Sequence, residues 1–139
     1  MFSRSIFIVP LIWVLAIITL APSCPNKSPE YYYSLADRKR AEGDNLVAIK
    51  CLSKAIKDKP DYLDAYKMRA DLWLKEDSID RAVDDLTKII DLKPSGDAYF
   101  QRGNAYYVGV KDSLACKDYY KACDLNHNKS CDLWRKYCK

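Results

Sequence analysis

Small apolar residues recur along the chain at a nearly fixed interval. Ala48-Ile49 returns as Ala82-Val83 and again as Ala115-Cys116, in steps of 34 and 33 residues. A period in this range predicts stacked helical hairpins, because one hairpin alone has too little core and buries its apolar face against a neighbour. Three further sets of residues recur at the same interval. The first is Ala36, Ala70 and Gly103, the second is Ala55, Ile89 and Ala122, and the third is Pro60, Pro94 and His127.

Larger apolar residues lie between the small ones at spacings that fit helix packing. Small residues allow two helices to cross closely, large apolar side chains fill the space between crossings, and each proline ends a helix. The large apolar positions are Leu35, Leu52, Leu72, Leu86, Tyr106 and Tyr119. This pattern predicts an all-α chain with helix pairs at 29–42 and 45–58, 63–75 and 79–92, and 96–108 and 112–124, followed by a last helix at 129–138.

The repeated unit resembles the tetratricopeptide repeat (TPR) from residue 29 to about 125. Tyr-x-x-x-Ala occurs at Tyr32 to Ala36 and at Tyr66 to Ala70, and the run at 99–106, Tyr-Phe-Gln-Arg-Gly-Asn-Ala-Tyr, matches the pattern best. The chain departs from the pattern at Lys39, where an aromatic residue is expected, and at Asp77, where the turn has a glycine. The resemblance implies a right-handed α-solenoid of about three TPR hairpins with a C-terminal capping helix.

The first residues have the pattern of a secretory signal. An uncharged stretch from Ile6 to Ala21 follows Arg4 and precedes the small or turn residues at 22–26, which is the order found in signal peptides. The stretch has 16 residues, fewer than the ~20 that a spanning helix needs, and Pro10 disfavours a helix there. We therefore expect a signal peptide at 1–23, with an uncleaved anchor as the alternative.

Two cleavage signals overlap at the bond before Cys24. Ala21-Pro22-Ser23 has the small residues of an ordinary cleavage site, whereas Ser23-Cys24 resembles the lipobox of bacterial lipoproteins. Either signal releases a chain that starts at Cys24. We expect lipid attachment there, because a cysteine directly after an apolar signal has no other evident role. The rest divides into a short tether at 24–28 and a TPR domain at 29–139, exported to the bacterial cell envelope and membrane-attached on its periplasmic or outer surface.

The paired spacing of four C-terminal cysteines predicts two disulfides. Cys116 and Cys123 are seven residues apart, as are Cys131 and Cys138. In an antiparallel hairpin whose turn centres on His127, Cys116 lies opposite Cys138 and Cys123 lies opposite Cys131. Bridges within a helix, or crossed between the two helices, would need to span about 10 Å between Cα atoms, beyond the ~7 Å limit. Export favours disulfides over free thiols.

The other uses of these cysteines are less favoured by their spacing. The four thiols with His127 are an alternative ligand set for a metal ion, but structural zinc motifs place ligands two to four residues apart. We therefore expect no metal, and we expect His127 to be a loop residue. Cys51 is expected to be a semi-buried helix residue, and its repeat contains no histidine to activate it as a nucleophile.

Composition and charge narrow the function classes. The 139 residues suit one domain, and a net charge of +4 from mixed signs is too small to indicate nucleic-acid binding. The chain has one histidine, no glycine-rich phosphate loop and no C-x-x-C motif, so we predict no enzyme, no cofactor and no small-molecule substrate. The remaining classes are an interaction module that recruits or braces a partner in a cell-envelope complex, a structural accessory subunit bound through its convex face, and a thiol or metal protein.

The resemblance also implies where a partner binds. TPR proteins usually bind extended or helical peptides on the concave face, which the first helix of each pair lines. Their clamp for a C-terminal carboxylate needs several Lys, Arg and Asn residues, of which only Lys67 and Asn104 match, while Asp37 and Asp71 stand where asparagine is expected. A mixed polar and aromatic ligand surface is therefore expected, rather than a binder of chaperone tails. The partner-binding positions are Tyr33, Asp37, Arg40, Lys67, Asp71, Leu74, Phe100, Asn104 and Tyr107.

Overall fold

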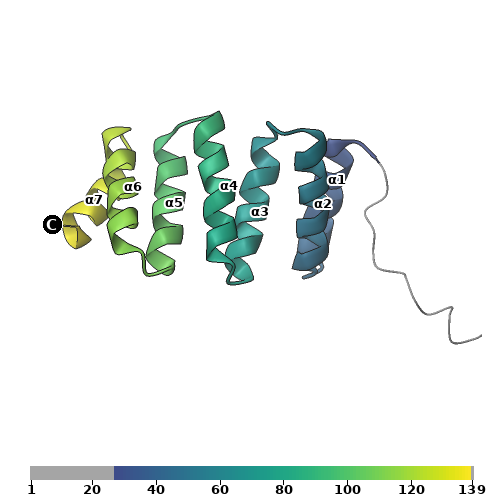
Figure 1. The fold of residues 1–139 in the computed structure, drawn as a ribbon, viewed down its shortest axis with the longest axis horizontal. Coiled ribbons are helices and arrows are strands. Elements are labelled where there is room, and N and C mark those ends of the chain that lie inside the picture. Colours follow the sequence, from purple (N-terminus) through teal and green to yellow (C-terminus); the bar gives the residue numbers. More distant parts are fainter. Residues whose placement is uncertain (1–26, 139) are drawn as a thin grey trace, which may run out of the picture.

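The described chain is a row of helices packed side by side. The structure is a computed structural model that describes residues 27–138, and its regular secondary structure there is entirely α-helical. Consecutive helices pack on one another in an elongated array (Figure 1). The predicted all-α class of stacked hairpins is confirmed. The helices are α1 (Pro29–Ala41), α2 (Asn45–Asp58), α3 (Leu63–Lys75), α4 (Ile79–Leu92), α5 (Gly96–Val108), α6 (Asp112–Asp124) and α7 (Asn128–Tyr137).

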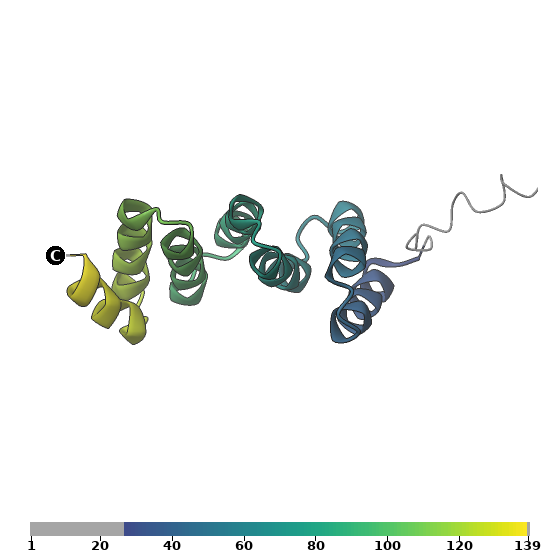
Figure 2. The same cartoon turned by 90° about the horizontal axis from the view of Figure 1, so that it is seen from below.

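The array has two rows. Seen from below, α1, α3, α5 and α7 form one row, and α2, α4 and α6 form the other (Figure 2). The predicted small residues lie where helices cross, and Ala48 and Ala82 have no exposed surface. Gly103 shows how close the crossing is, because a Cβ atom added there would lie 2.9 Å from the ring of Tyr119. The row of first helices is therefore held tightly against the row of second helices.

The three hairpins turn at the same column of the repeat. Gly43, Asp77 and Val110 occupy this column and have left-handed backbones, with φ angles of 82°, 54° and 56°. Aspartate tolerates the left-handed backbone region better than most residues, so the second repeat can form its turn with Asp77 in place of the expected glycine. Valine is β-branched and is unfavourable there, so the third turn is strained.

Most of the predicted large apolar positions fill the core. Leu52 and Leu72 have no exposed surface, and Leu86 and Tyr119 are also buried. Two positions are only partly buried, which the sequence did not predict. Leu35 lies on α1, the end helix, which has no described repeat before it. The other is Tyr106 on α5, whose ring centroid lies 5.8 Å from the guanidinium carbon of Arg102.

An arginine that the sequence analysis missed joins the first two hairpins. Arg69 on α3 donates hydrogen bonds of 2.8 and 2.6 Å to the carboxylate of Asp85 on α4. It donates a third, of 2.9 Å, to the hydroxyl of Ser53 on α2. Burial raises the pKa of the Asp85 carboxyl, while the hydrogen bond from Arg69 acts in the opposite direction. Arg69 therefore fastens its own hairpin and attaches it to the preceding one.

Arg102 makes the same set of contacts in the third hairpin. It donates to the carboxylate of Asp118 on α6 at 2.8 and 2.9 Å, and to the hydroxyl of Thr87 on α4 at 3.0 Å. The hydrogen bond to Asp118 raises the pKa of Arg102 above its usual value, so this arginine stays charged. The recurrence of Arg and Asp at the repeat interval is the sequence signal that identifies both pairs.

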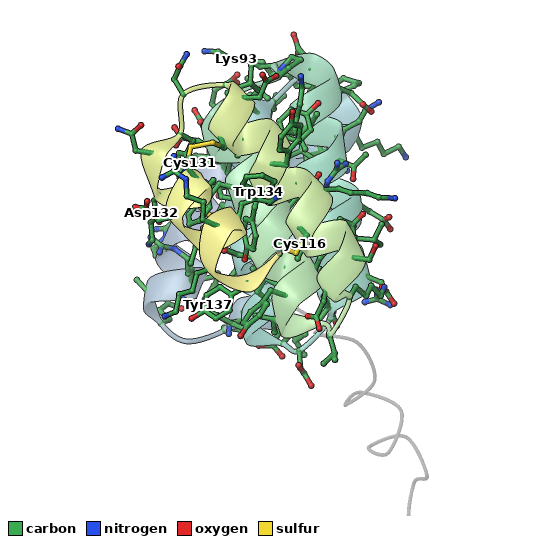
Figure 3. The ribbon with its side chains drawn as sticks, turned by 90° about the vertical axis from the view of Figure 1, so that its left-hand side faces the viewer. Lys93, Cys116, Cys131, Asp132, Trp134 and Tyr137 are labelled. Atoms are coloured by element: carbon green, nitrogen blue, oxygen red, sulfur yellow. A yellow bond between two sulfur atoms is a disulfide. The ribbon has the colours of Figure 1, made fainter. Side chains whose placement is uncertain are left out.

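Two disulfides fasten the last helix to the array. Cys116–Cys138 and Cys123–Cys131 join α6 to α7, with Cα–Cα distances of 5.5 and 4.7 Å, and they match the expected pairing. Figure 3 looks onto this end of the molecule, where α7 lies against α6. The four sulfurs are bonded in two pairs, so they are not free thiols that could bind a metal ion. Across residues 27–138, no three metal-ligating side chains come together.

Cys51 is buried more deeply than expected. It was predicted to be semi-buried, but it has no exposed surface on α2. The sixth cysteine of the chain, Cys24, lies outside the described residues, as do the expected signal peptide at 1–23 and the start of the tether. Within the described helices, none is long and apolar enough to span a membrane.

Candidate interaction groove

The row formed by the odd-numbered helices carries a series of open pockets. The first lies between α1 and α3 and has a volume of about 420 Å³. Five of the nine predicted partner-binding residues line it, namely Tyr33, Arg40, Lys67, Asp71 and Leu74. The sequence analysis missed three further lining residues, which are Asp64, Met68 and Lys75.

Charges of both signs surround this first pocket. Asp37, a predicted residue outside the lining, accepts two hydrogen bonds from Arg40, and this contact raises the pKa of Arg40. Desolvation raises the pKa of the Asp71 carboxyl, with an opposing effect from Lys75 and Arg40. Desolvation also raises the pKa of Tyr33, so its phenol is neutral and able to donate a hydrogen bond at neutral pH.

A second pocket of about 430 Å³ continues the groove from α3 to α5. Asp64 and Lys67 line both the first and the second pocket, so the two are contiguous. Asp97 and Gln101 on α5 and Lys93 after α4 lie on the far side. Apart from Lys67, the family pattern gave no position here, because these side chains come together only through the packing of two neighbouring repeats.

The third pocket lies between α5 and α7 and has a volume of about 260 Å³. Its α5 wall contains the predicted residues Phe100, Asn104 and Tyr107. The oxygen of Asn104 accepts a 2.9 Å hydrogen bond from the hydroxyl of Tyr119, which fixes the orientation of the amide. The opposite wall belongs to α7, through Lys129, Leu133 and Tyr137.

The role of α7 differs from the expected one. It was predicted only as a cap, yet it stands in the row of first helices and supplies side chains to the groove (Figure 2). Tyr137, labelled at the end of α7 in Figure 3, has its ring centroid 6.2 Å from that of Tyr107. The four-residue spacing of Lys129, Leu133 and Tyr137 is the sequence signal for this face.

His127 packs against Phe100, which lines the third pocket. It lies in the loop between α6 and α7, as expected, and its side chain also caps α7 by accepting a hydrogen bond from the main-chain nitrogen of Ser130. Its ring stacks on Phe100 with centroids 4.4 Å apart, and the ammonium of Lys129 lies 5.2 Å from the Phe100 centroid. Phe100 is therefore partly covered by the protein itself, and only its remaining surface lines the pocket.

The groove is suited to binding. It contains aromatic rings, cations, carboxylates and an amide along one continuous row of helices. Pockets lined by aromatic and polar side chains are characteristic of surfaces that recognise a segment of a partner protein.

Comparison with known proteins supports the fold. No family model matches the chain. Human tetratricopeptide repeat protein 13 is 35% identical over 95 residues, which make up 68% of this chain and 11% of that protein. The chain therefore spans about a tenth of this relative.

Solved structures give the same result. The crystal structure of MamA is 29% identical, with a TM-score of 0.68, and the match covers 74% of this chain and 61% of that one. The first TPR domain of Spaghetti (RPAP3), bound to the HSP90 peptide SRMEEVD, is 23% identical, with a TM-score of 0.68 and coverage of 80% and 90%. The N-terminal domain of STI-1 from C. elegans is 16% identical, with a TM-score of 0.74 and coverage of 80% and 94%.

These similarities define an α-solenoid built from helical repeats. More specifically, the chain belongs to the tetratricopeptide repeat proteins, and its residues 27–138 form three hairpins followed by a helix that disulfides join to α6. The fold predicted from the repeat period is therefore confirmed.

Proposed function

We propose that this chain is a non-enzymatic protein-interaction module that binds a segment of a partner protein along the groove of α1, α3, α5 and α7. The main support for this proposal is that eight of the nine predicted residues line two pockets in one row of helices. The ninth, Asp37, accepts a hydrogen bond from Arg40 beside them. The Spaghetti domain, which shares the fold, has a peptide bound.

The side chains of the groove favour a segment that carries polar and aromatic residues. The first pocket has the cations Arg40, Lys67 and Lys75 beside the carboxylates of Asp64 and Asp71, so it complements a ligand with charges of both signs. The third pocket has aromatic walls and takes an apolar or aromatic side chain.

The proposal includes export to the bacterial cell envelope and attachment to a membrane on its periplasmic or outer surface. Disulfides persist outside the cytosol, and the two bridges that hold α7 support this location. Attachment uses a lipid at Cys24. A lipid thioether and a disulfide to the buried Cys51 would use the same Cys24 sulfur, so they exclude each other.

Intact mass of the mature protein tests the attachment. A lipidated chain is heavier than residues 24–139 by its acyl groups, whereas a bridge between Cys24 and Cys51 removes only two hydrogens. Finding the bridge would refute lipidation, and an uncleaved chain would support the N-terminal anchor instead.

Crosslinking and affinity capture from native membranes test the groove. The variant Arg40→Ala, Lys67→Ala removes two exposed cations from the groove, and the matched control Lys88→Ala, Lys117→Ala removes two exposed cations from the row of second helices. We expect the groove variant to lose a stoichiometric partner and the control to keep it.

The reverse result favours a different function. A partner lost only in the control would show binding through the convex face and would support the accessory-subunit alternative. If both variants keep the partner, the groove proposal is refuted as well.

A further inference from the structure

The interaction groove does not use a set of lysines on α2. Lys50, Lys54 and Lys57 are four and three residues apart, so they share one side of this helix. Among residues 27–138, neither Lys50 nor Lys57 forms an ion pair, and the ammonium of Lys54 lies 5.7 Å from the centroid of the Tyr32 ring. We call these three residues the lysine face.

The same columns of the other second helices carry mixed charges. The α4 residues are Asp84, Lys88 and Asp91, and the α6 residues are Lys117, Lys121 and Asp124. On α6, Lys121 pairs with Asp124 at 2.9 Å. These three columns of α2 therefore carry positive charge alone, in contrast with the same columns of α4 and α6, and the lysine face attracts an anionic partner.

The chain enters the domain beside the lysine face. The main-chain nitrogen of Lys27 donates a 2.9 Å hydrogen bond to the hydroxyl of Tyr32, the ring that Lys54 approaches. Lys27 is three residues from Cys24, a span of at most about 10 Å. A membrane that holds Cys24 therefore lies close to the point where the chain reaches Tyr32 and Lys54.

We propose that the lysine face rests on the anionic lipid headgroups of the membrane that carries the chain. The inference rests on the membrane attachment proposed above. Each lysine near an anionic surface strengthens binding about fivefold, and three strengthen it about a hundredfold. In this orientation α2 faces the membrane, and the row of odd-numbered helices, with the groove, faces away from it (Figure 2).

Lysine footprinting of the mature protein tests the lysine face directly. The protein is bound to vesicles of phosphatidylcholine alone or with added phosphatidylglycerol, and acetylation of each lysine is followed by mass spectrometry. We expect Lys50, Lys54 and Lys57 to react several-fold more slowly on the anionic vesicles, and Lys88 and Lys117 to be unaffected. High salt should remove the protection, because the Debye length falls to about 3 Å at 1 M.

Equal rates on both vesicle types, or equal protection of all lysines, would overturn the proposal. Protection in native envelopes without protection on phosphatidylglycerol vesicles would assign the lysine face to an acidic macromolecule and would overturn it too. Intact mass of the same sample reports attachment at Cys24 separately. An acylated chain with unprotected lysines refutes the lysine face alone, whereas protected lysines on an unacylated chain refute lipidation alone.

Matched variants give a second test that does not depend on the anchor. In a Cys24→Ser background, Lys50→Gln, Lys54→Gln, Lys57→Gln should lower partitioning onto phosphatidylglycerol vesicles about a hundredfold. The control Lys88→Gln, Lys117→Gln, Lys121→Gln removes the same net charge and should have a much smaller effect. Equal losses would show that only net charge matters and would overturn the proposal.

Discussion

Removing the Cys116–Cys138 disulfide tests what holds α7 in place. This bridge closes a loop of 22 residues, and the Cys123–Cys131 bridge closes 8 residues inside it. With the inner bridge intact, the outer one constrains about 14 further residues of the unfolded chain, and the loop-entropy relation gives about 3 kcal/mol. The inner bridge contributes about 2 kcal/mol when the outer one is intact.

The assay compares two paired variants by thermal unfolding and hydrogen exchange. Cys116→Ser, Cys138→Ser should lower the Tm by about 10 °C, and the matched Cys123→Ser, Cys131→Ser should lower it less. Because α7 is the last helix and packs mainly on α6, its amides should lose protection first, while the amides of α1 to α4 keep theirs.

Two results would refute this reasoning. If the Tm and the exchange of α7 are unchanged without the outer bridge, contacts such as the Tyr120–Trp134 ring pair, with centroids 5.4 Å apart, suffice to hold the helix. A larger loss from the inner pair would show that loop length does not determine the stabilisation.

Three further substitutions test the packing by thermal unfolding. Val110→Gly should raise the Tm by a few degrees, because glycine removes the backbone strain of a left-handed valine and raises the free energy of unfolding by about 0.5–1 kcal/mol. A lower Tm would contradict the strained turn. Gly103→Ala should cost about 1–3 kcal/mol through the clash with Tyr119, so a neutral result would reject the close crossing. Arg102→Met should lower the free energy of unfolding by about 3–5 kcal/mol, because it leaves the Asp118 carboxylate buried without its partner. The double variant Arg102→Met, Asp118→Leu should recover most of this loss. If the double variant is as unstable as Arg102→Met, the ion pair itself stabilises the fold.

Local sequence signals accounted for most of the fold. The predicted helix bounds agree with the observed ones to within about a residue, because prolines and capping residues mark the ends. Ser28 and Ser95 cap their helices through hydrogen bonds to the main-chain nitrogens of Tyr31 and Ala98. These signals act within a few residues of the chain, so they are readable without any knowledge of packing.

Features that depend on contacts between repeats were not predicted. Cys51 stands in the column that Asp85 and Asp118 occupy in the later repeats, and Leu35 stands in the column of their arginine partners. The first hairpin therefore buries a cysteine where the others bury an ion pair. The lining of the second and third pockets likewise depends on how α3, α5 and α7 lie together, which the repeat pattern alone does not specify.

The bonds of Arg69 and Arg102 have a consequence for ligand choice. Each arginine is bonded both within its own hairpin and to the preceding one, so a change in tilt between neighbouring hairpins would break charge-assisted hydrogen bonds. The distances between successive pockets are therefore fixed before any ligand arrives. On the proposed function, a partner is therefore expected to be selected by the spacing of its side chains along the backbone, and a segment with the right residues at the wrong intervals is expected to bind weakly.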